Sequence, residues 1–207
     1  YATVLPSILP RKPNGQHNET VGSIVIAGLG MSNCAQEIAH WMNVLGLPAS
    51  FRPCGKLINL ASASEDMADL ANPLSNYWVN KFPALLAAAG VTALQVQIIV
   101  VPETAYAYLD FIYPPIGEHQ ATMTADIRLT AINAKAVMPN LQVALFGPRY
   151  YGGFAPGSKS PDQVDAPLCN NSQYAIRDAV RNVFTGVAEW QPSSPLPLID
   201  WAAPIWS

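Results

Sequence analysis

Short apolar runs alternate with amphipathic segments along most of this 207-residue chain. Each run is rich in Val, Ile and Leu, a composition typical of strands that are buried on both faces of a sheet. We expect strands at residues 23–28, 57–60, 96–101 and 141–146. Apolar residues recur at helical spacing between and after the strands. We expect helices at about 33–45, 75–89, 120–138 and 172–184. This alternation predicts an α/β domain with a mainly parallel sheet.

The two ends of the chain differ from this pattern. Residues 1–21 are rich in Pro, Asn and Gly and show no sustained period, which predicts an extended lead-in. Residues 189–207 contain four prolines and three of the five tryptophans, and we expect them to pack as an extended strap without regular structure. Residues 22–188 are then the single folded domain.

Composition restricts the class of protein. Only 12% of the residues are charged, against about 25% in a typical soluble domain, and 50% are apolar. The net charge is -3 and no cluster of Lys and Arg occurs, which argues against a nucleic-acid or anionic membrane partner. No apolar run approaches the roughly 20 residues that span a bilayer. We therefore expect a weakly charged protein with no membrane span.

Several features favour a secreted or extracytoplasmic protein. The chain has few charges, 19 prolines and two Asn-x-Ser/Thr sequons, so Asn18 and Asn170 are candidate glycosylation sites. Three cysteines are present, and two of them, Cys34 and Cys54, flank the first predicted helix. We expect these two to form a disulfide if the intervening loop folds back, the alternative being two buried thiols.

The end of the first predicted strand carries the most suggestive chemistry. Ligands of open α/β sheets bind at the carboxyl ends of the strands, and Ser32 follows Gly30 at such an end. A serine there exposes its hydroxyl and places its own amide at a helix N-terminus, where an oxyanion is stabilised. The alternative is that Ser32 or Asn33 only caps the helix and that the glycines allow the turn.

The stretch from Ile24 to Glu37, which contains Gly30-Met31-Ser32-Asn33, resembles the first block of the SGNH (GDSL-like) hydrolase superfamily. Within that superfamily it is most similar to a bacterial branch with Gly-Met-Ser-Asn in place of Gly-Asp-Ser. Further stretches are similar, in order, to the later blocks, at residues 60–66, 89–100 and 139–153. The resemblance implies a flavodoxin-like three-layer α/β/α sandwich that hydrolyses esters or acetyl groups, with Ser32 as the nucleophile.

The sequence departs from that family at the other catalytic positions. Ser62 or Ala63 stands where the second block has a glycine, and Ala105 stands near the asparagine of the third block. No histidine follows His119, so the Asp-x-x-His pair that the family implies is not matched. His119 is then the candidate for the base that a serine nucleophile needs.

Other polar residues at strand ends are candidates for binding a ligand. Arg149 beside Tyr150 suits a carboxylate or a sugar, although an arginine that anchors its own loop is an equal alternative. The candidate ligand-binding residues are Asn33, Ser62, Glu103, Arg149 and Tyr150. The chain lacks zinc-type Cys/His spacing, a phosphate-binding loop and a complete dinucleotide fingerprint, so we expect no metal and no cofactor.

Taken together, these features favour a secreted, SGNH-hydrolase-like protein whose catalytic site is incomplete. Its role would be structural, self-assembling or glycan-interacting, with copies of itself or a carbohydrate as partners, because a surface with few ions is suited to burial. The alternative is an active serine esterase or carbohydrate deacetylase in which Ser32 works with a non-standard base.

Overall fold

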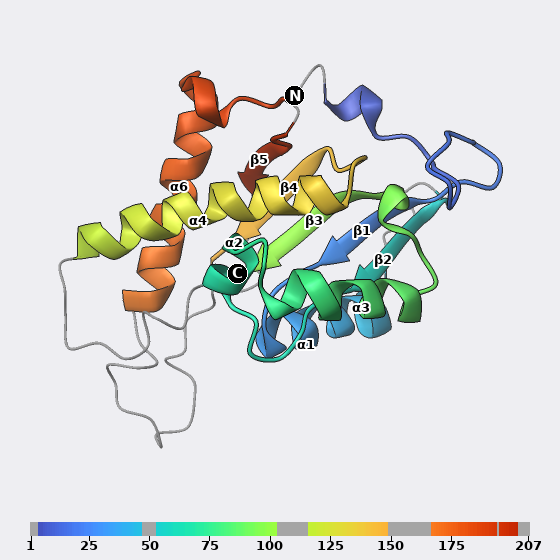
Figure 1. Ribbon diagram of the computed structural model, residues 1–207, viewed down its shortest axis with the longest axis horizontal. Coiled ribbons are helices and arrows are strands. Elements are labelled where there is room, and N and C mark those ends of the chain that lie inside the picture. Colours follow the sequence, from blue (N-terminus) through green and yellow to red (C-terminus); the bar gives the residue numbers. More distant parts are fainter. Residues whose placement is uncertain (1–3, 47–52, 103–115, 149–166, 194, 203–207) are drawn as a thin grey trace.

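The computed structural model describes residues 4–46, 53–102, 116–148, 167–193 and 195–202. Its centre is a sheet of five parallel strands in the order β2-β1-β3-β4-β5 (Figure 1). This is the strand order of flavodoxin-like folds, so the α/β prediction is confirmed. The strands are β1 (Ile24–Gly28), β2 (Gly55–Asn59), β3 (Val96–Pro102), β4 (Val143–Gly147) and β5 (Leu198–Trp201).

Helices cover both faces of the sheet. The α-helices are α1 (Ser32–His40), α2 (Met67–Ala71), α3 (Phe82–Ala88), α4 (Ile116–Val137) and α6 (Pro167–Phe184). Short helical turns complete the described segments: η1 (Leu5–Ser7), η2 (Trp41–Leu45), η3 (Tyr77–Lys81), η4 (Ala93–Gln95) and η7 (Ala188–Trp190). None of the helices in the described ranges is long and apolar enough to cross a membrane.

The direction of each crossover decides which face a helix covers. The chain moves one way from β1 to β2 and the opposite way in the connections to β3, β4 and β5. Right-handed crossovers therefore place α1 on one face and α2, α3, α4 and α6 on the other. The larger hydrophobic core includes residues of all four of these helices, and a smaller core contains Ile38 of α1 with Ile26 and Leu57 of the sheet.

The C-terminal segment corrects one prediction. We expected residues 189–207 to lack regular structure, but Leu198–Trp201 forms β5 beside β4. The two prolines at 195 and 197 precede this strand, so they remove no hydrogen-bond donor from it. Leu198 N donates to the carbonyl of Gln142 at 2.9 Å. The strand is too short for its apolar pattern to be recognised among the prolines.

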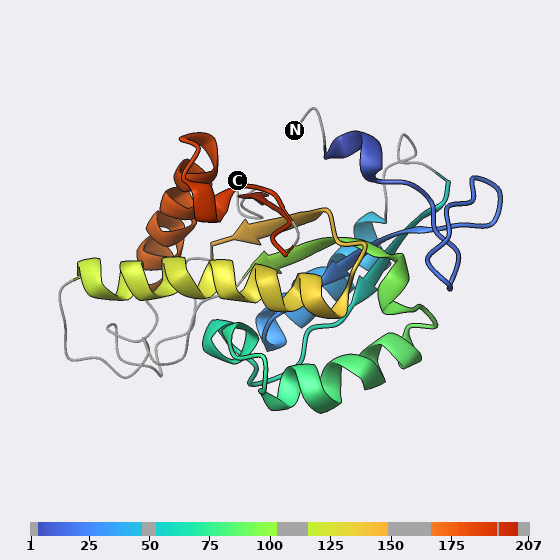
Figure 2. The ribbon, with the colours of Figure 1, turned by 45° about the horizontal axis from the view of Figure 1, so that its top comes forward.

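The N-terminal segment folds back at the amino ends of the strands (Figure 2). Arg11 forms antiparallel bridges with both His17 and Ser23. Gly22 lies so close to this crossing that a Cβ atom there would approach the Asn18 carbonyl oxygen to 2.3 Å. The lead-in is therefore packed against the start of β1, at the end of the sheet opposite to Ser32.

The predicted disulfide is wrong, because its two cysteines lie at opposite ends of the same pair of strands. Cys54 precedes Gly55, which pairs with Ile24 at the start of β1, whereas Cys34 lies beyond the end of β1. Four residues of strand separate these ends by about 13 Å, well beyond the Cα separation that a disulfide spans. The Cys34 thiol instead donates to the carbonyl of Leu29 at 3.1 Å.

Candidate functional site

The strand order places a topological switch point between β1 and β3. After β1 the chain turns to the face covered by α1, and after β3 it turns to the face covered by α4. The Leu29 N–H still donates to the carbonyl of Val100 at 2.9 Å, so the two strands separate just beyond this bond. Ligands of open α/β sheets bind at such a point, and α1 begins there with Ser32 (Figure 1).

Ser32 does not cap its helix. The N-cap residue is Met31, whose side chain makes no capping hydrogen bond, and Ser32 is the first helical residue. The prediction that Ser32 or Asn33 is the N-cap is therefore wrong. Ser32 is exposed, and its backbone N–H belongs to the first helical turn, where amides lack partners within the helix. A hydroxyl, an amide and the positive end of a helix dipole coincide at this position.

Glycine is required at two positions in the turn that leads to Ser32. Gly30 has a φ of +138°, a conformation that residues with a side chain rarely adopt. At Gly28, a Cβ atom would lie 2.3 Å from Cγ1 of Ile38, so α1 packs directly on the backbone of β1. These glycines place the start of α1 at the carboxyl end of the strand.

The segment after β2 runs beside this turn. Leu60 N donates to the Gly28 carbonyl at 2.9 Å, and Ser62 N donates to the Gly30 carbonyl at 2.8 Å. The structure therefore brings Ser62 next to the turn that carries Ser32. The same bond occupies the Ser62 amide, which could not then also donate to an oxyanion.

A buried tyrosine contacts the segment that follows β2. The Tyr77 hydroxyl donates to the Leu60 carbonyl at 2.9 Å, and the ring packs against Trp78 and Phe82. Burial raises the pKa of Tyr77 well above its ordinary value, and Cys34 and Glu65 add to this shift. Tyr77 thus stays a neutral hydrogen-bond donor.

Ser64 is the one residue other than glycine with a positive φ in the described part of the chain, at +68°. A left-handed backbone costs about 1 kcal/mol for a residue with a Cβ atom, and glycine avoids this strain. The strained position lies in the exposed loop after β2, close to the turn of Ser62.

We expect Ser64→Gly to stabilise the protein by about 0.5 kcal/mol, because relief of the strain exceeds the extra entropy of glycine in the unfolded chain. Urea denaturation measures the change. Ala63→Gly is the matched control: Ala63 is exposed in the same loop without a positive φ, so glycine there should only destabilise. Equal destabilisation by both substitutions would contradict strain at Ser64.

The acidic residues of this loop have structural partners. Glu65 is buried and forms an ion pair with Lys81. Asp66 caps α2 in a reciprocal pair of hydrogen bonds with Asp69, each 3.1 Å long. Asp126 of α4 has its pKa raised to about 6, first by burial and then by the negative charge of Asp66. No cluster of three potential metal ligands occurs among the described residues.

Replacing Asp126 should therefore change the pH dependence of stability. The folded pKa of about 6 lies above the ordinary 3.8, so the wild type loses stability as the pH rises between these values. Because the carboxyl group is only half-buried, we expect Asp126→Asn to raise the free energy of unfolding by about 1 kcal/mol at pH 7. Below a pH of about 4 the substitution should leave it unchanged. Denaturation across pH measures this. The exposed Glu189→Gln is the control, and a gain that is constant with pH would contradict the argument.

The histidines are far apart in the fold. His17 pairs with Glu19 at the amino end of the sheet, and His40 ends α1, so neither lies beside Ser32. His119 belongs to the first turn of α4, a helix that begins on the carboxyl side of the sheet because it follows β3. The side chain of His119 lies outside what the structure describes, as do Glu103, Arg149 and Tyr150 in full.

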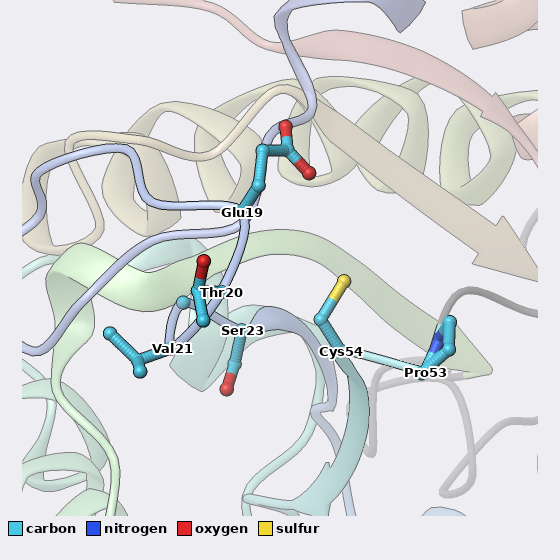
Figure 3. Close-up of a pocket in the computed structure, with 7 residues that line it drawn as sticks. Glu19, Thr20, Val21, Ser23, Pro53 and Cys54 are labelled. Atoms are coloured by element: carbon cyan, nitrogen blue, oxygen red, sulfur yellow. The ribbon is translucent and has the colours of Figure 1, made fainter.

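The two sequons lie in different parts of the fold. Asn18 accepts hydrogen bonds from the amides of Thr20 and Val21, at 2.9 and 2.8 Å, in a turn at the amino end of the sheet. Beside it lies an open hollow lined by residues 19–23, Pro53 and Cys54 (Figure 3). Asn170 falls within α6, its side chain lying outside the described residues. Glycosylation of either stays a prediction.

Sequence reasoning missed two residues that shape the site. Asn59 ends β2, and its side chain joins that strand to α1 at Ala35. Tyr77 supports the same loop from another helical segment. A polar residue at the end of an apolar strand was a signal for Asn59, whereas nothing in the local sequence indicated the long-range contact of Tyr77.

Comparisons with known proteins add no relative. The chain matches no known family, and no curated protein and no solved structure is significantly similar to it.

Proposed function

We propose that this protein hydrolyses esters, with Ser32 as the nucleophile. The observation that carries the proposal is the position of Ser32 at the switch point between β1 and β3. Ser32 is exposed, is the first residue of α1 and does not cap the helix. The likeness of residues 24–37 to the first block of the SGNH hydrolases supports the same role. The protein would take short-chain esters or acetyl groups on a carrier such as a carbohydrate.

In the proposed reaction, the Ser32 hydroxyl attacks the ester carbonyl and gives its proton to a base. The backbone N–H of Ser32, at the positive end of α1, stabilises the oxyanion. We propose His119 as the base, because α4 follows β3 and so begins at the carboxyl edge of the sheet, the edge at which Ser32 lies. The protonated base then gives this proton to the oxygen of the leaving alcohol. Water, which gives a proton to the same base, attacks the acyl-enzyme, and the acid leaves as the proton returns to the Ser32 oxygen.

A fluorophosphonate probe tests the proposal directly, because it reacts with the hydroxyl of an activated serine. We expect one equivalent to attach to Ser32, as located by peptide mass spectrometry, and to block the hydrolysis of p-nitrophenyl acetate. His119→Ala should slow both reactions. Absence of labelling at Ser32 would contradict the proposal.

A second candidate is a non-catalytic protein that assembles with copies of itself or binds a glycan. It is favoured by the Ser62 amide, which is already bonded to Gly30 and so is not free to complete an oxyanion hole. The low charge fraction of 12% also suits burial against another surface. Light scattering tests assembly, and a strictly monomeric protein at high concentration would count against it. Secretion is part of both proposals.

A further inference from the structure

We propose that Asn59 is a positioning residue that fixes Ser32 relative to the sheet, an inference that rests on the proposed esterase function. Asn59 is the last residue of β2, and its side chain is half-buried. Its Nδ2 donates to the carbonyl of Ala35 at 2.8 Å, and its Oδ1 accepts from the amide of Ala61 at 3.1 Å. One carboxamide therefore joins α1 to the segment that follows β2.

The bonded carbonyl belongs to the helical turn that contains the nucleophile. Ala35 N donates to the Met31 carbonyl at 3.0 Å, which closes the first turn of α1 around Ser32. A shift of Ala35 would therefore move Ser32 with it. On the other side, the Ala61 amide lies next to Ser62, whose own amide bonds to the turn at Gly30.

The remaining contacts of α1 with the sheet are largely apolar. Ile38 and Cys34 pack against Ile26 and Leu57 in the smaller core. Apolar contacts are non-directional, so they hold the helix on the sheet but resist sliding along its axis less well. A hydrogen bond of 2.8 Å depends on direction as well as distance and fixes the position of the first turn.

A small displacement of a nucleophile has a large effect on rate, because a misplacement of about 1 Å lowers a rate by up to 10²-fold. We expect Asn59→Asp to lower kcat about tenfold, less than this upper limit. The carboxylate still accepts from Ala61, but it cannot donate to the Ala35 carbonyl and repels it. KM should stay unchanged, because the variant replaces no side chain of the exposed surface around Ser32.

Asn140→Asp is a matched control. The Asn140 Nδ2 also donates to a backbone carbonyl, that of Leu94, at 2.7 Å, and the side chain is half-buried as well. This bond lies at the amino end of the sheet, far from Ser32. We expect both variants to lower Tm similarly, whereas only Asn59→Asp lowers kcat and slows the labelling of Ser32 by the fluorophosphonate.

The experiment combines kcat and KM with hydrogen exchange of the Ala35 amide, which is bonded to the Met31 carbonyl and closes the first turn of α1. Faster exchange there in Asn59→Asp than in Asn140→Asp supports the proposal that Asn59 holds the first turn of α1. Equal exchange in the two variants overturns it, whatever the activity. Equal losses of kcat in both variants also overturn the positioning role. Wild-type protein without turnover or labelling would overturn the proposed function, while the exchange measurement would still decide whether Asn59 holds this turn.

Discussion

Ser32→Ala is expected to lower kcat/KM for a short p-nitrophenyl ester by at least about 10³-fold, because loss of the nucleophile in serine hydrolases removes most of the catalytic acceleration. The bound ester would have no group to attack its carbonyl, so the loss should fall on kcat rather than on KM. Since Ser32 is exposed and caps nothing, the free energy of unfolding should change by less than about 0.5 kcal/mol.

Ser193→Ala is the control for this loss. Ser193 is exposed in the segment that precedes β5, at the amino end of the sheet, and it contacts the Leu196 carbonyl through its backbone amide, which the substitution keeps. Its turnover should therefore equal that of the wild type. Residual turnover in Ser32→Ala at the wild-type level, or an equal loss in Ser193→Ala, would show that Ser32 is not the nucleophile and would favour the non-catalytic candidate.

The sequence predicts the sheet well because most of the buried strands are continuous apolar runs. The run at 96–101 is almost entirely β-branched, and it forms β3 at the centre of the sheet. The edge strand β5 has only four residues, beside two prolines, so its role depends on pairing with β4 rather than on its own pattern. Tertiary pairing of this kind leaves no local signal.

The candidate site was predictable only in part, for a similar reason. The glycines and Ser32 are adjacent in sequence, so their turn could be recognised from that segment alone. The contacts of Asn59 with Ala35 and of Tyr77 with Leu60 join residues from different elements. The disulfide prediction failed because nearness of Cys34 and Cys54 along the chain does not show that a parallel strand pair places them at opposite ends.

Gly28→Ala is expected to destabilise the protein by about 2–3 kcal/mol, the upper part of the range for overpacking a core. The added Cβ would lie 2.3 Å from Cγ1 and 2.7 Å from Cδ1 of Ile38. Ile38 is buried and β-branched, so it has no free rotamer to adopt, and α1 must move away from β1. That movement also displaces Ser32, so turnover should fall by up to about 10²-fold.

A second substitution tests whether this contact is the cause. Ile38→Ala alone should cost about 3 kcal/mol through the cavity that it leaves. In the double variant the Cβ added at position 28 occupies part of that cavity, so the combined loss should be smaller than the sum by about 2 kcal/mol. Urea denaturation of the four proteins gives this coupling free energy.

Gly147→Ala at the end of β4 is the matched control, since its Cβ would meet Ala202 at an ordinary 3.4 Å. Additive losses of stability in Gly28→Ala and Ile38→Ala, or an equal loss of stability in Gly147→Ala, would contradict the argument. Close packing of α1 on β1 would then not be what holds Ser32 at the switch point.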